Sequence, residues 1–383
     1  MRINSKSILA GMALGALLLT GCNDAEYDTL SNQAYILQTN TNANSSLKLT
    51  VGAEVATTTL NVRLSDVANV ESRYRLVYDT AVVNKYNRLN ETPYASLPQE
   101  SFSLSSEETT IEAGASVSTP ITLTVPPYSE ALKASGKKYA IGFRLENTSG
   151  NASVLPSGSK IVYILDQVVI QPVVVLDQSH YVSQNLVKNY PLTEWTVEMN
   201  INKHILYTEV GRGNNQAIFG AGPDEIYIRF GDAPIEGNRL QIKTQGTQMN
   251  SLALFNEHTW YHLAFVCTGT KLYLYVNGQL DNSMDLPGKT TNVNSINICS
   301  PSTYWLGNAM YSEVRFWQRA RSQAEIANNM YACDPTTPGL ITYYKMNEGE
   351  GYSFRDASGN GNNAETNGQA VPEWIQDVRI DGK

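Results

Sequence analysis

The sequence has little cysteine and little histidine. Four cysteines and four histidines occur among 383 residues, and no two cysteines have the Cys-x-x-Cys spacing that is typical of zinc sites. His258 and His262 have the i, i+4 spacing of a helical zinc pair, but they enter a predicted strand, in which four residues span about 13 Å. The two rings are therefore not expected to chelate one ion.

Positive charge and nucleotide-binding motifs are scarce as well. The chain has 28 Lys and Arg against 36 Asp and Glu, and this acidic balance without a basic run makes nucleic acid an unfavourable partner. No phosphate-binding loop, dinucleotide fingerprint or Gly-x-Ser-x-Gly motif occurs. A catalytic triad or a carboxylate pair assembled from distant strands remains an open alternative, which spacing along the chain does not reveal.

Long hydrophobic runs are absent after the first twenty residues. The apolar run over 8–19 follows a short basic region and is too short to span a bilayer, so we expect a processing segment. The run ends at Leu19-Thr-Gly-Cys22, which resembles the lipobox of bacterial lipoproteins. The resemblance implies removal of residues 1–21 and acylation of Cys22, with membrane attachment through lipid alone. An ordinary secretory signal is the alternative.

Residues 22–32 are expected to be a tether. Asp24 and Glu26 weakly resemble the acidic signal for surface display in Bacteroides-type lipoproteins. That resemblance implies an outer-membrane location with the protein facing the cell exterior. A solvated tether without such a signal is the other interpretation.

Alternation of apolar and polar residues recurs along the rest of the chain. It predicts short strands, among them 60–64, 121–125, 139–145, 161–165, 195–201 and 226–230. One helix is expected after Ser322, which forms a capping box with Glu325, and no convincing helix is seen in the first half. Strands with one apolar face must pair two sheets to bury it, so we predict an all-β chain of two sandwich domains.

The second half resembles the laminin-G/concanavalin-A-like jelly roll over about 200 residues. The resemblance is carried by 260–266, 272–278, 313–322, 339–351 and 356–361. The first half, through 102–105, 110–114, 120–125 and 138–141, is more loosely similar to a domain of unknown function in Bacteroides-type surface lipoproteins. We therefore expect an Ig-like β-sandwich over 33–168, a linker over 169–178 and the jelly roll over 179–383.

This pairing of domains resembles accessory proteins of glycan-utilisation systems. It implies a non-catalytic protein that binds a host or dietary glycan, with N-glycans among the candidates, beside a glycosidase or importer of the same system. A protein-binding adhesin or assembly component is the first alternative, because the fold does not decide the ligand. A divergent glycosidase is the second, although no Glu-x-Asp-x-Glu strand is present.

A sugar site needs an exposed aromatic ring beside amide or charged groups. Trp305, with Tyr304 and Asn308, lies in a turn-rich connection and is one candidate. Arg212 and Asn214 in a polar loop are the second candidate. The alternatives are a Trp305 ring folded over the sandwich edge and a loop that is only a solvated hairpin end.

The stretch FRDASGNGNNA begins like an EF-hand loop, but position 12, counted from Asp356, is Asn367 instead of glutamate. We interpret it as a turn in which Asp356 and Ser358 bond nearby backbone amides. No cofactor is required by this interpretation. A structural calcium ion on Asp356 and Asn360 remains the alternative, since some laminin-G-like relatives hold calcium.

Overall fold

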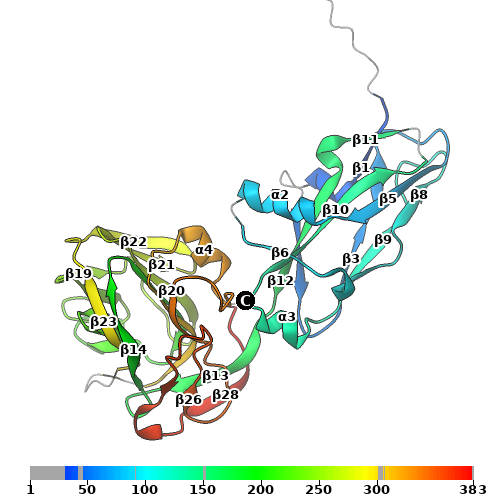
Figure 1. The fold of residues 1–383 in the computed structure, drawn as a ribbon. Helices are drawn as coiled ribbons and strands as arrows, with labels where there is room; N and C mark the ends of the chain where they lie inside the picture. The colour runs from blue at the N-terminus through cyan, green and yellow to red at the C-terminus, as the bar shows by residue number, and fades with distance from the viewer. Residues whose placement is uncertain are drawn as a thin grey trace, which may run out of the picture.

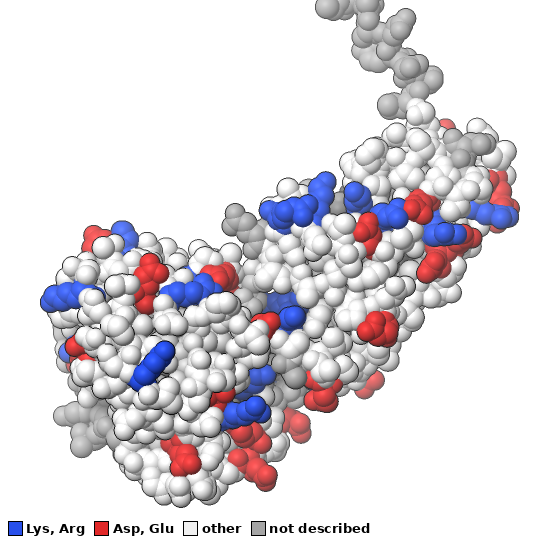
Figure 2. All heavy atoms as spheres, in the orientation of Figure 1, with Lys and Arg blue, Asp and Glu red and all other residues white. Residues whose placement is uncertain are grey.

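The computed structural model describes residues 31–41, 46–90, 92–149, 152–300, 305 and 307–381, arranged as two β lobes (Figure 1). Cys22 and the predicted signal and tether up to residue 30 lie outside the described residues. In the described part of the chain, no helix is long and apolar enough to cross a membrane. On the face drawn in Figure 2, Lys and Arg are interspersed with Asp and Glu.

The first lobe is built from three small sheets. Their strand orders are β2-β12-β10-β5-β8 with β6 beside β10, β11-β1-β4, and β3-β9-β7. The strands are β1 Gln33–Ile36, β2 Ser46–Val51, β3 Ala56–Leu60, β4 Val62–Leu64, β5 Ser72–Tyr78, β6 Ala95–Ser96, β7 Ser103–Leu104, β8 Glu108–Ile111, β9 Ile121–Val125, β10 Tyr139–Asn147, β11 Ser153–Val154 and β12 Lys160–Gln167. The predicted alternation is confirmed, because Leu60, Val62 and Leu64 are all buried.

This lobe also contains helices that the sequence did not indicate. They are α2, Thr80–Asn90, and α3, Glu130–Ala134, with 3-10 turns at Leu37–Thr41, Gln99–Ser101 and Pro156–Gly158. The expectation of no helix here was wrong. Helix α2 buries only Val82 and Val83, which pack on Ala140 and Val162, so its apolar stripe is too narrow to give a helical period.

The second lobe is a sandwich of two large sheets, with orders β22-β21-β20-β15-β24-β13-β28, where β25 joins β24, and β14-β23-β16-β17-β18-β19. Its strands are β13 Ile170–Leu176, β14 Val182–Leu192, β15 Trp195–Lys203, β16 Gln216–Pro223, β17 Ile226–Phe230, β18 Leu240–Thr244, β19 Thr247–Asn250, β20 Trp260–Cys267, β21 Lys271–Val276, β22 Gln279–Asp285, β23 Thr291–Ile298, β24 Ala309–Trp317, β25 Leu340–Tyr344, β26 Ser353–Phe354, β27 Ala364–Glu365 and β28 Glu373–Arg379. The predicted all-β sandwich architecture is confirmed.

The connection between the lobes is shorter than expected. Most of the predicted linker, 169–178, is strand β13, which pairs with β24 and β28 inside the second lobe. Pro172 lies where the register with β28 shifts, a position that tolerates its missing N–H. Only Val168 and Val169 separate β12 from β13, and the end of the chain returns to this junction, where Ile380 N donates to Val169 O (Figure 1).

The predicted helix after Ser322 is α4, Gln323–Asn328, and its capping box is present. A 3-10 turn, Asn367–Gln369, follows the short hairpin of β26 and β27. This hairpin adjoins the edge strand β14 through a bridge between Val182 and Thr366. The hairpin and the edge strand together form the walls of a polar pocket.

Candidate functional site

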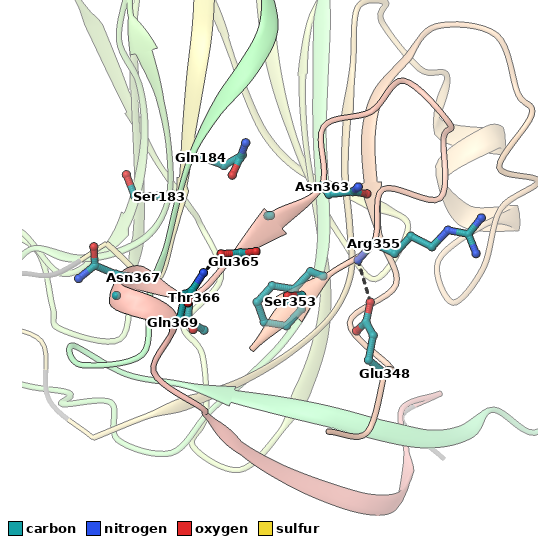
Figure 3. Close-up of a pocket in the computed structure, with 13 residues that line it drawn as sticks. Ser183, Gln184, Glu348, Ser353, Arg355, Asn363, Glu365, Thr366, Asn367 and Gln369 are labelled. Carbon is teal, nitrogen blue, oxygen red and sulfur yellow. Dashed lines mark hydrogen bonds between the residues drawn. The ribbon is translucent and has the colours of Figure 1, made fainter. Parts of the chain in front are cut away.

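A pocket of about 870 Å³ opens between β14 and the β26–β27 hairpin (Figure 3). Its lining is predominantly polar and combines four amides, three charged groups and three hydroxyls. The amides are Gln184, Asn363, Asn367 and Gln369, the charged residues are Glu348, Arg355 and Glu365, and the hydroxyls are Ser183, Ser353 and Thr366. Such a set of donors and acceptors suits a ligand that is rich in hydroxyl groups.

Several of these polar groups are held by hydrogen bonds within the pocket wall. Gln369 Nε2 donates to Glu365 Oε2 at 3.0 Å, and Glu348 Oε1 accepts from the Arg355 backbone N–H at 3.0 Å (Figure 3). Asn367 is fixed through its backbone N–H, which donates to Tyr181 O. The backbone that carries these side chains is thus held in place by hydrogen bonds.

An apolar layer underlies the pocket. The Phe354 ring is fully buried, and its centroid lies 6.0 Å from that of Trp374. Trp374 is anchored in turn, because its Nε1 donates to Gly351 O at 2.9 Å. The hairpin is therefore attached to the sandwich by aromatic packing, while its polar side faces the pocket.

The wall behind Arg355 and Asn363 is the stretch FRDASGNGNNA. Asp356 is buried, and its Oδ1 accepts from the backbone N–H groups of Tyr343 and Ser358, both at 3.0 Å. Its Oδ2 accepts from Asn362 N at 3.1 Å. The interpretation of this stretch as a turn held by Asp356 is confirmed, and the carboxylate ties the loop to β25.

The same contacts bear on the calcium alternative. Asn360 Nδ2 donates to the carbonyl oxygens of Leu340 and Ile341, so both candidate ligands already bond to protein groups. Among the described residues, no group of three or more His, Cys, Asp or Glu is placed to hold a metal ion. The geometry gives Asp356 and Asn360 a bracing role.

The predicted Trp305 site needs a correction. Trp305 is only 3% exposed and packs in the core of the second lobe, with Lys203 Nζ 4.3 Å above its ring. The prediction of an exposed sugar platform was therefore wrong, because the ring packs into the core of the sandwich. Tyr304 lies outside the described residues, and Asn308 is half-buried and accepts from His204 N through its backbone oxygen.

The second predicted pair belongs to a different surface. The Arg212 guanidinium stacks 4.0 Å from the Tyr207 ring and contacts Glu209 at 3.4 Å. Asn214 precedes Asn215, whose Oδ1 accepts from Tyr227 Oη at 2.8 Å. Neither Arg212 nor Asn214 lines the polar pocket. The sequence signal that pointed toward the polar pocket was the stretch FRDASGNGNNA, because its members Arg355 and Asn363 line it.

A buried charge cluster lies on the opposite side of the sandwich. Glu198 on β15 contacts Arg321 at 2.6 Å, Arg315 at 3.5 Å and His262 at 3.4 Å, and all four side chains are at most 2% exposed. Arg315 Nη1 also donates to Asn329 O, so the segment after α4 covers the cluster. These groups are closed off from a substrate, and they act as a structural network.

This cluster predicts a pH dependence of stability. Burial lowers the pKa of His262, and Glu198 only partly opposes the effect. The unfolded chain takes up a proton near pH 6.5, whereas folded His262 stays neutral to lower pH, so stability falls by at most about 1.4 kcal/mol per pH unit below that value. The midpoint of thermal unfolding, followed by tryptophan fluorescence, should therefore be lower at about pH 5.5 than at about pH 7.5. The midpoint of His262→Gln should fall less between these two pH values. An equal fall in the variant and the wild type would show that His262 does not cause the pH dependence.

Comparisons with known proteins agree with this architecture. A family model described as the concanavalin A-like lectin/glucanases superfamily matches residues 177–327, and a second, described as an N-terminal domain, matches residues 30–152. No curated protein matches the chain.

Among solved structures, the chain is similar to a Bacteroides ovatus ATCC 8483 protein proposed to bind carbohydrate. The two are 22% identical with a TM-score of 0.62, over 91% of this chain and 100% of that one. A structure of Bacteroides thetaiotamicron EndoBT-3987 with a Man5GlcNAc product is 20% identical over 35% of this chain and 30% of that one, with a TM-score of 0.30. The similarity to the Bacteroides ovatus protein supports the two-domain fold. The TM-score of the second structure is too low to support any conclusion. Residues 177–327 of the second lobe thus match the concanavalin A-like lectin/glucanases superfamily model, and they follow residues that match a separate N-terminal domain.

Proposed function

We propose that this chain binds extracellular glycan at the polar pocket beside β14 and does not cleave it. The observation that carries the proposal is the amide-rich lining, in which Gln184, Asn363, Asn367 and Gln369 converge on a domain of a lectin superfamily. Amides donate and accept at once, as sugar hydroxyls do, so such groups match a carbohydrate surface. The similarity to the Bacteroides ovatus protein adds support.

The proposal includes display at the outside of the outer membrane through lipid on Cys22. Anchoring would keep captured glycan close to a glycosidase or importer of the same system, which raises its local concentration. Palmitate labelling of the wild type, lost in Cys22→Ser, is the test of the anchor. Protease accessibility on intact cells is the test of the exterior face.

Glycan binding is tested with the full chain in detergent on an array of host and dietary oligosaccharides, followed by calorimetry with the strongest neutral ligand. We expect Gln369→Ala to weaken binding about three- to tenfold, the effect of one lost hydrogen bond. Asn294→Ala replaces an exposed amide on β23 outside the pocket and should bind like the wild type.

The array also separates the alternatives. If no glycan binds, or if Gln369→Ala and Asn294→Ala bind equally, the pocket is not the sugar site. Capture of a protein ligand by a chain that ignores every glycan would favour the adhesin alternative. Release of reducing ends from a bound oligosaccharide would favour the glycosidase alternative.

A further inference from the structure

A second pocket, of about 510 Å³, lies between the two lobes at the short connection. Val51 and Gln167 of the first lobe line one side, Val168 and Val169 line the back, and strand β13 begins the other side. Its volume is within the range of small-molecule sites, which often form at domain interfaces. It shares no lining residue with the polar pocket beside β14.

The interdomain pocket is rich in tyrosine from both lobes. Tyr128 comes from the segment before α3, and Tyr331 and Tyr343 come from the second lobe. Tyr128 is packed edge-on against Tyr139, with ring centroids 5.7 Å apart, which fixes its orientation. Tyr128 and Tyr343 are buried, so half-buried Tyr331 and exposed Pro127 offer the apolar area for the C–H face of a sugar ring.

One hydroxyl in this pocket lacks a partner. Tyr128 is 6% exposed, and its Oη has no hydrogen-bond partner within the described part of the chain. A buried hydroxyl without a partner costs free energy, so such groups normally meet protein, water or ligand. Tyr128 lines the pocket, so a molecule bound there lies beside this residue, and a small shift of the ring would bring Oη within its reach.

The charges of the lining are largely compensated. Glu130 pairs with Lys133 at 2.9 Å, and Glu313 pairs with the buried Arg315. Lys345 lies over the Tyr343 ring at 6.0 Å. The polar groups that remain are mainly amides, among them Gln171 and Asn347. This composition favours an uncharged, hydroxyl-rich ligand over an anionic one.

The pocket depends on close packing of the lobes. Gly136, just after α3, lies so near the second lobe that an added Cβ would be 2.1 Å from Cys333 O. Lys137 Nζ approaches Asp334 Oδ2 at 4.0 Å beside it. Alanine at position 136 would therefore push the lobes apart, and φ of +64° at this residue adds to the strain.

We propose that this interdomain pocket is a second sugar site, which holds a neutral hexose unit between the lobes with Tyr128 Oη as a hydrogen-bonding group. The inference rests on the proposed glycan-binding function and extends it to a second, independent site. A sugar held by both lobes would also fix their relative orientation, because its contacts come from each of them.

The test is Tyr128→Phe in the full chain, which keeps the ring and removes only Oη. Calorimetry uses mannohexaose, cellohexaose and maltohexaose as neutral probes and hexagalacturonic acid as the charged probe. We expect whichever neutral probe binds the wild type to bind Tyr128→Phe about three- to tenfold more weakly. Without sugar, the midpoint of thermal unfolding should stay unchanged or rise, because the substitution removes an unpaired buried hydroxyl.

Two further variants make the result specific. Tyr163→Phe removes another buried hydroxyl, in the core of the first lobe, and should bind like the wild type. Gly136→Ala should weaken binding as Tyr128→Phe does. Unchanged affinity in Tyr128→Phe, a lower midpoint without sugar, or preference for the charged probe would overturn this pocket as a neutral-sugar site. If only Gln369→Ala weakens binding, the proposed function stands and the interdomain site falls, and if no probe binds, both fall.

Discussion

Replacing Glu198 by alanine is expected to destabilise the second lobe by about 3–5 kcal/mol, because it leaves the buried Arg321 without its counter-charge and leaves Arg315 with Glu313 alone. Glu198 lies between Arg321 at 2.6 Å and Arg315 at 3.5 Å, with His262 at 3.4 Å, and its side chain is fully buried. Burial alone would raise its pKa, but attraction by Arg321 and Arg315 outweighs this effect and holds the pKa well below the ordinary value. The carboxylate is thus charged in the folded protein at neutral pH.

The measurement is guanidinium unfolding followed by tryptophan fluorescence. All five tryptophans occur at or after position 195, so this signal reports on the second lobe alone. Asp285→Ala is the matched control, because Asp285 forms an exposed pair with Lys271 at 3.1 Å and should contribute no more than about 1 kcal/mol. Similar unfolding midpoints for Glu198→Ala and Asp285→Ala would show that the cluster is not a stabilising network.

The Glu198 cluster also shows what the sequence could and could not predict about the fold. Strict alternation from Trp195 to Ile201 identifies the face of β15 that packs between the sheets. The same pattern predicts a solvated opposite face, yet Thr196, Glu198 and Asn200 are buried there too. This outer face of β15 is covered by α4 and the segment after it. Their packing on β15 is a long-range contact, which the periodicity of a strand does not predict.

Turn chemistry was more predictable, because it depends on neighbouring residues. Asn277 and Gly278 both adopt positive φ, 51° and 76°, in the turn between β21 and β22, as an Asn-Gly pair favours. Cys267, Cys299 and Cys333 are buried and free, as small apolar side chains in a core commonly are. Such features need only local geometry or side-chain polarity.

The candidate site was less predictable. Aromatic content pointed to Trp305, but whether a ring in a turn faces solvent depends on the core space beneath it, which Trp305 fills. The polar pocket combines β14 with residues more than 160 positions later, such as Asn363 and Gln369. No local pattern joins these segments, and the bridge between Val182 and Thr366 that does so is a tertiary contact.

Replacing Asp356 by alanine is expected to destabilise the second lobe by about 3 kcal/mol, somewhat less than the loss of Glu198. The carboxylate accepts from three backbone N–H groups, those of Tyr343, Ser358 and Asn362, and from the Ser358 hydroxyl at 2.6 Å. Asp356 is only 4% exposed, so alanine would leave buried donors unpaired. Asparagine should recover only part of the loss, because its Nδ2 is a donor where the loop presents donors.

The comparison variant is Glu350→Ala, which removes an exposed carboxylate from the same connection and should leave tryptophan-detected unfolding unchanged. Asp356→Ala should also weaken glycan binding at temperatures where the lobe is still folded, because the loop that it braces carries Arg355 and Asn363 into the pocket. If Asp356→Ala loses stability but binds glycan normally, Asp356 stabilises the loop without being needed for the glycan site. A variant as stable as Glu350→Ala would instead mean that other contacts, such as Asn362 Nδ2 to Ile341 O, suffice to hold the loop.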